Sequence, residues 1–213
     1  AENAVTRKYL DNIPMRKNIL KRLKETANYE KIGIPFKRQG KWYVYRNNGL
    51  QNQSVLYQMD SPTADASKQR VWLDPNALST DGTVALKGIY FSHNGRYMAY
   101  VISRSGSDWE EIYVKDCQTG RDIDHIVWAK FTGATWLGDG FYYSAYDAPE
   151  KGRETSAKNS VQKIYYHKIG TPQSEDQLFF MNPTQPLRFY NVDIDHDEKV
   201  MTLNEGGMDN GNN

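Results

Sequence analysis

Three aspartates near the end of the chain have the alternate spacing of the first ligands in a calcium-binding loop. Asp193, Asp195 and Asp197 would occupy positions one, three and five of that loop. The sixth position, where the sharp turn needs glycine, is Glu198. The twelfth position, where a bidentate glutamate is needed, is Asn204. We therefore predict a strand end and its turn here, and no metal site.

The histidines and the single cysteine do not form a recognisable site either. His93, His125, His167 and His196 fall in four different contexts, and no two have the spacing of metal ligands. Cys117 rules out an internal disulfide framework and a zinc site built from cysteines. Its place in the turn sequence KDCQTG predicts an unreactive surface thiol. One cysteine leaves both a cytoplasmic and a periplasmic location open.

Motifs that carry catalysis are missing from the sequence. It contains no G-x-S-x-G nucleophile turn, no glycine-rich phosphate loop and no pairing of cysteine with histidine. We therefore assign no catalytic residue and no cofactor to this chain. Any reaction in which the chain takes part would need residues from elsewhere.

Charge and hydropathy exclude two classes of partner. The formal net charge is +1, so we expect no bulk attraction to nucleic acid or to a membrane surface. A basic stretch at residues 16–24 is interpreted as a solvated helix face, because no aromatic residues alternate with its charges. No apolar run approaches the roughly 18 residues of a spanning helix. The opening AENAVTRKYL is not a signal peptide, so we expect the chain to begin partway into a longer protein.

The first 32 residues are predicted to be helical. Apolar residues recur at helical spacing in residues 5–13 and again in residues 19–27. Pro14 separates the two runs and suits the first turn of a second helix.

A meander of four short strands then defines the repeating unit of the chain. Its strands are rich in β-branched and aromatic residues and are separated by glycine, asparagine, serine and aspartate. The predicted strands are Leu86–Ser92, Tyr97–Ser103, Glu110–Asp116 and His125–Trp128. Four antiparallel strands in about 45 residues is the size of one β-propeller blade.

The same pattern recurs before and after this blade. The turn glycines Gly40, Gly95 and Gly140 mark it at intervals of 55 and 45 residues. The first blade contains Lys41–Asn47, Val55–Asp60 and Gln69–Asp74, and the third contains Phe141–Tyr146, Lys163–Ile169 and Asp176–Met181. Asp147–Ser160 is a polar insertion that predicts a surface loop, and Arg188–Glu205 repeats the first half of a blade.

The predicted fold class is therefore all-β, with a partial β-propeller over residues 33–213. It has about three and a half four-stranded antiparallel blades and follows the helical segment of residues 1–32. The chain ends in MDNGNN, where Asn-Gly signals another hairpin, so we expect a fragment of a larger protein. Open propeller edges expose unpaired backbone groups, which predicts self-association of the isolated chain.

Several longer stretches resemble landmarks of the prolyl oligopeptidase family. They are GLQNQSVLY (Gly49–Tyr57), LDPNALSTDGTVAL (Leu73–Leu86), SGSDWEEIYV (Ser105–Val114) and YYHKIGTPQSED (Tyr165–Asp176). The opening TRKYLDNIP is similar to the N-terminal helical segment of that family. The resemblance runs in order along essentially the whole chain.

The resemblance implies a larger enzyme. Members of the family carry a seven-bladed propeller inserted near the N-terminus of an α/β-hydrolase domain, and residues 1–32 would belong to that domain's N-terminal extension. The Ser, Asp and His of the triad follow the propeller, so this chain alone should be inactive. The implied parent protein is a serine endopeptidase that cleaves short peptides after proline. Its propeller covers the active site and excludes folded proteins, and the hydrolase domain is its partner in cis.

Two phenylalanines are the candidate substrate-binding residues. Phe131 and Phe189 are expected to begin innermost blade strands, whose starts line one face of the propeller tunnel. By the resemblance, that face meets the hydrolase domain, and both residues look like the apolar lining of outer substrate subsites. The alternative is that each aromatic ring packs between blades. A second reading of the whole chain is a propeller scaffold without enzymatic activity, which binds protein partners.

Overall fold

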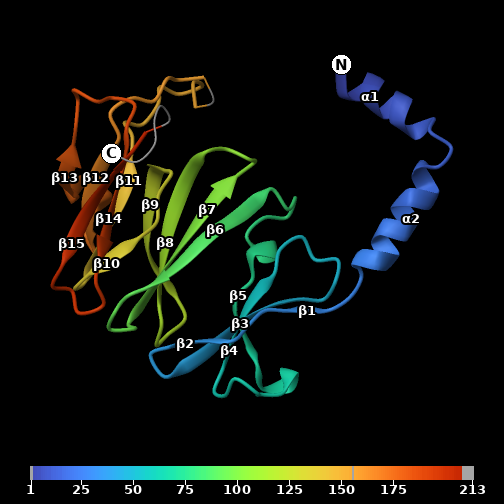
Figure 1. Cartoon of the computed structure of the whole chain (residues 1–213), viewed down its shortest axis with the longest axis horizontal. Coiled ribbons are helices and arrows are strands. Elements are labelled where there is room, and N and C mark those ends of the chain that lie inside the picture. Colours follow the sequence, from blue (N-terminus) through green and yellow to red (C-terminus); the bar gives the residue numbers. More distant parts are fainter. Residues whose placement is uncertain (1, 155, 208–213) are drawn as a thin grey trace. The chain divides into compact units, whose positions relative to one another are not determined.

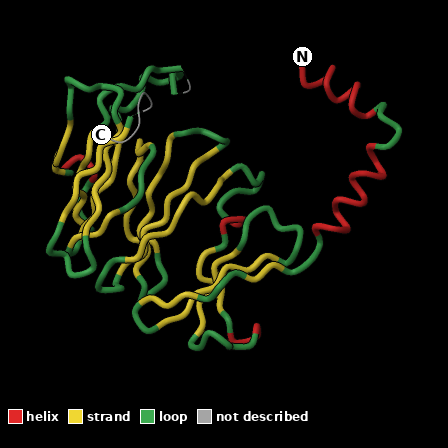
Figure 2. The backbone as a smooth tube through the Cα atoms, viewed as in Figure 1, coloured by secondary structure: helices red, strands yellow, loops and turns green. Residues whose placement is uncertain are grey.

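The computed structural model describes residues 2–154 and 156–207, which form two helices followed by antiparallel sheets (Figure 1). Figure 2 shows that strands and their connecting loops make up nearly all of the chain after the helices. The chain divides into two compact units, one of Ala1–Lys37 and Lys41–Asn76 and the other of Arg38–Gly40 and Ala77–Asn213.

The helical start is confirmed, but the helices end at Ala27, and Lys31–Ile32 within the predicted segment of residues 1–32 is a strand that pairs with the first blade. Helix α1 is Glu2–Asp11 and helix α2 is Arg16–Ala27. Pro14 lies before α2, whose N-cap is Met15, so its expected place in the first turn is wrong. Among the described residues, neither helix is both long and apolar enough to cross a membrane. The domain boundary after residue 32 stays a prediction.

The first blade follows the helices. Its strands are β1 (Lys31–Ile32), β2 (Phe36–Arg38), β3 (Lys41–Asn47), β4 (Val55–Met59) and β5 (Arg70–Leu73). The order is β1-β3-β4-β5, with β2 also paired to β3. Short 3-10 helices at Ala66–Lys68 and Pro75–Ala77 flank β5. Adjacent residues are buried in both β3 and β4, for example Tyr43 with Val44 and Val55 with Leu56, so side chains on both faces of these inner strands are covered.

The second blade is the meander that the sequence predicts. It consists of β6 (Val84–Phe91), β7 (Tyr97–Arg104), β8 (Trp109–Asp116) and β9 (Asp122–Lys130). Each strand pairs antiparallel with the next. Seven consecutive residues of β7 are buried, which places this strand in the middle of a core.

The third blade contains β10 (Thr135–Leu137), β11 (Gly140–Ala145), β12 (Lys163–Lys168) and β13 (Gln177–Met181), with a 3-10 turn at Gln173–Glu175. A single pairing of Ala145 with Ala129 joins β11 to β9, so blades two and three form one eight-stranded sheet. The last hairpin is β14 (Phe189–Ile194) with β15 (Met201–Gly206). The Asn-Gly hairpin expected at residues 210 and 211 lies outside the described residues. The all-β partial propeller is confirmed.

Aromatic and aliphatic side chains fill the space between blades two and three. Val101, Ile112 and Ile126 from blade two are fully buried against Trp136 and Phe141 from blade three. The Trp136 indole nitrogen donates to the Tyr90 carbonyl at 3.0 Å, which satisfies its only polar group. Apolar burial therefore supplies the contact, and this hydrogen bond orients the largest ring in it.

A buried ionic network also joins these two blades. The ring nitrogens of His167 lie 2.7 Å from an Asp176 oxygen and 3.0 Å from an Asp124 oxygen, and the His167 side chain is 0% exposed. The Tyr143 hydroxyl donates to Asp176 at 2.7 Å. The Gly170 N–H donates to Asp124 at 2.8 Å. The network draws on β9, β11, β12 and the segment before β13.

The sequence analysis aligned Gly40, Gly95 and Gly140 as equivalent turn glycines, and the structure agrees with only part of this alignment. Gly95 has a φ of 68°, and an added Cβ would meet the Gln39 side chain, so glycine is required at this turn. In the turn that precedes β11 of the third blade, the left-handed glycine is Gly138, with a φ of 57°. Gly140 instead opens β11, where a Cβ would lie 2.4 Å from the His167 carbonyl oxygen. Its need for glycine comes from close strand approach, so its alignment with Gly95 is wrong.

Candidate functional site

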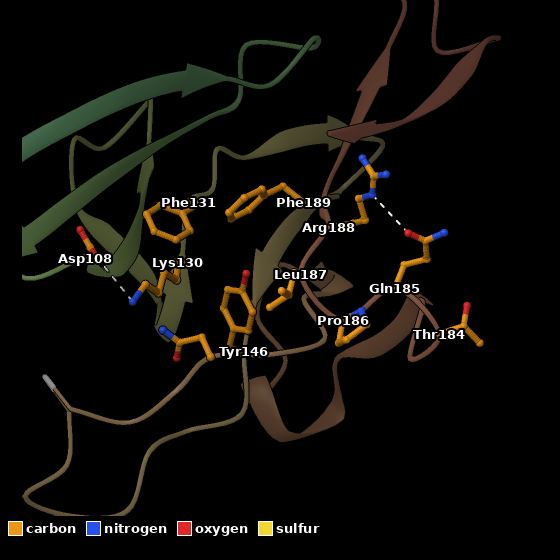
Figure 3. Close-up of a pocket in the computed structure, with 11 residues that line it drawn as sticks. Asp108, Lys130, Phe131, Tyr146, Thr184, Gln185, Pro186, Leu187, Arg188 and Phe189 are labelled. Atoms are coloured by element: carbon orange, nitrogen blue, oxygen red, sulfur yellow. Dashed lines mark hydrogen bonds and ion pairs between the residues drawn. The ribbon is translucent and has the colours of Figure 1, made fainter. Parts of the chain in front are cut away.

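A cavity of about 580 Å³ lies where the end of β9 meets the start of β14 (Figure 3). Its walls come from the second and third blades and from the segment that leads into the last hairpin. The lining residues are Asp108, Lys130, Phe131, Tyr146, Asn159, Thr184, Gln185, Pro186, Leu187, Arg188 and Phe189. Both phenylalanines singled out in the sequence belong to this set.

Phe131 and Phe189 contact each other at the cavity. Their ring centroids are 5.6 Å apart and their planes are inclined by 81°, an edge-to-face arrangement. Phe131 is 50% exposed and Phe189 is partly buried. Figure 3 shows the two rings side by side above Tyr146 and Leu187. The structure therefore brings the two candidates together, and their role in substrate contact stays a prediction.

The backbone at Phe131 differs from the expectation. Phe189 is the first residue of β14, as predicted, but Phe131 follows the end of β9 and the next strand begins only at Thr135. Its φ is 53°, a left-handed conformation that is uncommon for a bulky residue. The Glu110 carboxylate accepts a hydrogen bond from the N–H of Thr132 at 3.1 Å, which anchors this bend. The expectation that Phe131 begins a strand is therefore wrong.

Glu110 is held in an apolar setting beneath this bend. Its residue is buried, and burial raises the pKa of its carboxyl group, while the Thr132 N–H acts in the opposite direction. A carboxylate that accepts backbone N–H bonds can hold a strained bend because each bond is charge-assisted. The alternating strand pattern predicts neither role, since Glu110 was expected only to open a strand.

Lys130 is a site residue that sequence reasoning missed. Its ammonium group lies 5.0 Å from the Trp109 ring centroid and 5.2 Å from that of Phe131, so it stacks between two aromatic faces. Its side chain is only 9% exposed, and its nearest carboxylate, Asp108, lies 3.7 Å away. Of these two rings only Phe131 adjoins Lys130 in the sequence, and Trp109 comes from the start of β8, so no local signal revealed the full arrangement.

A second cation lies on the other side of the ring pair. The Arg188 guanidinium donates to the Gln185 side-chain oxygen at 3.2 Å and forms an ion pair with Glu205 at 3.4 Å. Together with Lys130 it gives the cavity two cations against the single carboxylate of Asp108. The cavity therefore combines aromatic walls with a cationic rim.

This chemistry supports binding and not bond cleavage. Among the described residues that line the cavity there is no serine, cysteine or histidine, the usual nucleophiles and base of peptide hydrolysis. Aromatic faces and a few placed polar groups are typical of a site that binds an apolar side chain and fixes its orientation.

Local hydrogen bonds and burial account for the aspartates and the cysteine that the sequence analysis considered. Asp195 accepts the N–H groups of Lys199 at 2.6 Å and Val200 at 2.9 Å, and Asp193 accepts from the Asn204 amide at 2.7 Å. Within residues 2–154 and 156–207, no three His, Cys, Asp or Glu side chains are placed to hold a metal ion. Cys117 is partly buried, and burial raises the pKa of its thiol to about 11, which keeps it protonated near neutral pH.

Comparison with known proteins finds a family model and relatives that match nearly the whole chain. A family model described as "Prolyl oligopeptidase, N-terminal beta-propeller domain" matches residues 1–207. The chain is 41% identical to a prolyl endopeptidase from Elizabethkingia miricola over 97% of its own length and 29% of the relative. It is 34% identical to prolyl oligopeptidase A from Galerina marginata over 95% of its length and 31% of the relative.

Solved structures agree with the sequence relatives. Prolyl oligopeptidase B from Galerina marginata, solved with a 25mer macrocyclization substrate, superposes with a TM-score of 0.85 at 29% identity. That match covers 95% of this chain and 31% of the other. The chain therefore spans about three tenths of the length of the proteins it matches.

Proposed function

Because this chain belongs to the prolyl oligopeptidase family, as its N-terminal β-propeller portion, we propose that it serves a serine endopeptidase that cleaves short peptides after proline. The observation that carries the proposal is the match of residues 1–207 to the propeller domain of that family. In this proposal the propeller covers the active site and admits substrates by size. The reaction itself uses a serine, histidine and aspartate of an α/β-hydrolase domain.

The cavity at Phe131 and Phe189 is proposed to receive an outer residue of the peptide. Its support is the half-exposed Phe131 ring, the edge-to-face pair and the volume of about 580 Å³, which is ample for one side chain. A ring that only packed between blades would be buried, as Phe141 is.

The two helices are proposed to pack against the hydrolase domain. Ile19, Leu20 and Leu23 form an apolar stripe on α2, and each is about half exposed. Exposed apolar stripes of this kind commonly mark a surface that another domain or protein covers. The hydrolase domain is the partner in cis that the proposal already requires.

Cleavage assays on two proteins test the proposal. The first is the 213-residue chain, and the second is a longer protein in which the same chain is joined to its hydrolase domain. We expect the longer protein to cleave a short peptide after proline and the 213-residue chain to show no turnover. A longer protein that binds partners but cleaves no proline peptide would instead support a propeller scaffold. Turnover by the purified 213-residue chain, persisting through further purification, would contradict the assignment of the chemistry to the hydrolase domain.

The isolated chain is also proposed to self-associate. Strand β13 is at the edge of its sheet, and Leu178, Phe179 and Met181 on it are exposed. An edge strand with apolar side chains offers backbone groups and apolar surface to a second copy. Sedimentation across a wide concentration range should show a rising average mass, and a single monomeric species throughout would argue against this.

A further inference from the structure

Gln162 is buried and hydrogen-bonds to both chain segments that carry the phenylalanine pair. Its residue is 1% exposed. Its side-chain oxygen accepts the N–H of Tyr190 at 2.6 Å, and its side-chain nitrogen donates to the carbonyl of Lys130 at 3.5 Å. Lys130 directly precedes Phe131, and Tyr190 directly follows Phe189. One amide therefore spans the two chain segments that present the rings.

A second polar bridge runs parallel to the first. The Ser144 hydroxyl donates to the carbonyl of Tyr190 at 2.9 Å, and the Ser144 N–H donates to the Thr132 hydroxyl at 2.7 Å. Thr132 is the residue whose N–H bonds to Glu110. The segment around Phe131 is thus held on both sides of that residue, at Lys130 and at Thr132, and both connections lead to Tyr190.

We propose that Gln162 is a positioning residue that holds Phe131 and Phe189 in their edge-to-face arrangement and so sets the preference of the cavity for its peptide residue. The proposal rests on the function proposed above. An amide suits this place, because its oxygen accepts from the Tyr190 N–H while its nitrogen donates to the Lys130 carbonyl. An apolar side chain here would take away the acceptor that the buried Tyr190 N–H uses, and buried N–H groups without a partner are rare in proteins.

A similar amide clamp elsewhere offers a matched control. Gln173 accepts the N–H of Val127 at 3.0 Å and donates to the carbonyl of Val127 at 2.8 Å. It joins β9 to the segment before β13 and is not among the residues that line the cavity. Gln173→Leu should therefore lower stability much as Gln162→Leu does, while it leaves the ring pair unchanged.

The first measurement uses the 213-residue chain and needs no activity. With labelled phenylalanines, of which there are seven, NMR should show a cross peak between the rings of Phe131 and Phe189. We expect Gln162→Leu to abolish this cross peak and Gln173→Leu to retain it. In Gln162→Glu, a protonated carboxyl group again offers one acceptor and one donor, so the cross peak should return as the pH is lowered. This variant keeps the test decisive if Gln162→Leu does not fold.

The second measurement uses the longer enzyme and a pair of proline peptides, one long enough to reach the cavity and one too short. We expect Gln162→Leu to lower the long-to-short ratio of kcat/KM about 5-fold, mainly through KM, because a displaced ring contacts the long peptide less well. Gln173→Leu should leave the ratio unchanged.

The outcomes separate this inference from the proposed function. A cross peak retained in Gln162→Leu overturns the inference, and so does an unchanged peptide ratio in an enzyme that cleaves after proline. A wild-type enzyme that does not cleave after proline rejects the proposed function alone. In that case the cross peak still decides whether Gln162 positions the rings.

Discussion

Two contacts between blades, which we call junctions, lie near opposite ends of strands β9 and β12. Charged side chains hold the first junction together, and a neutral amide holds the second. Near one end of both strands, His167 lies fully buried between Asp124 and Asp176. Near the other end, the neutral amide of Gln162 spans Lys130 and Tyr190. The first junction is ionic and closed, whereas the second is uncharged at its centre and opens into a cavity.

The two junctions differ in whether they leave polar groups or aromatic rings available to a ligand. Around His167, both ring nitrogens face carboxylates, and the Tyr143 hydroxyl and Gly170 N–H fill further acceptor positions. No donor in that set remains for a ligand, so the network can only join the blades. At the cavity the amide occupies backbone groups alone, and the phenylalanine rings remain available. The neutral amide of Gln162 adds no further charge to a cavity that Lys130, Arg188 and Asp108 already line.

Removal of the histidine should have the largest effect. His167→Leu leaves two carboxylates facing a buried apolar side chain, so we expect a loss of about 3 to 5 kcal/mol in the free energy of unfolding. Urea unfolding of the 213-residue chain measures it. His125→Leu is the control, because His125 is exposed and should cost less than about 1 kcal/mol. Equal losses in the two variants would contradict the distinction between the two junctions.

Truncation of Phe131 should have the next largest effect, which we expect on kcat/KM and not on stability alone. In the longer enzyme, Phe131→Ala removes apolar contact of roughly 1 to 2 kcal/mol with a long peptide, a loss of about 5- to 30-fold in kcat/KM. A peptide too short to reach the cavity should be nearly unaffected. The long-to-short ratio is the quantity to measure, with Phe141→Leu as a core control. An unchanged ratio in a merely less stable Phe131→Ala enzyme would leave the ring as packing.

Strand positions were predictable from the sequence because period-two alternation and turn residues are local signals. All four strands of the second blade lie within a few residues of their predicted bounds. The polar connections between blades were not predictable. His167 and Asp124 are 43 residues apart, and Gln162 and Tyr190 are 28 residues apart, so no local pattern links them. Phe131 was found through resemblance, but its left-handed bend depends on Glu110, a contact that only the folded chain provides.

The pH dependence of stability should distinguish the two junctions further. Burial lowers the pKa of His167, but hydrogen bonds and charge from Asp176 and Asp124 outweigh it, so the pKa is raised above its ordinary value. A raised pKa means that the folded state holds this proton more tightly than the unfolded state. Its contribution is therefore complete below the ordinary histidine value, about pH 6.5, and is lost as the pH rises through the raised pKa.

The measurement is the free energy of unfolding of wild type minus that of His167→Gln, followed from pH 6 upward. We expect the difference to decrease with a slope of at most about 1.4 kcal/mol per pH unit, the limit for one proton. Gln162→Leu should show no such slope relative to wild type, because no titrating group is removed. A pH-independent difference for His167→Gln would mean that the pKa of His167 is the same in the folded and unfolded chains, and a difference that grows with pH would mean that the imidazole is neutral in the folded chain.

The smallest predicted effect concerns the cationic rim of the cavity. Lys130 stacks between Trp109 and Phe131, and its nearest carboxylate, Asp108, lies 3.7 Å away on a well exposed side chain. A cation whose carboxylate partner is so exposed should favour a peptide with a carboxylate at the residue that reaches the cavity by about 0.2 to 1 kcal/mol, or up to about 5-fold. Lys130→Met keeps the apolar stem and removes the charge. The measurement is kcat/KM for matched peptides with Glu or Gln at that residue. We expect the preference for Glu to disappear in Lys130→Met, and to weaken with added salt in wild type. A preference that survives Lys130→Met would assign it to Arg188, whose own pairing with Glu205 makes it the weaker candidate.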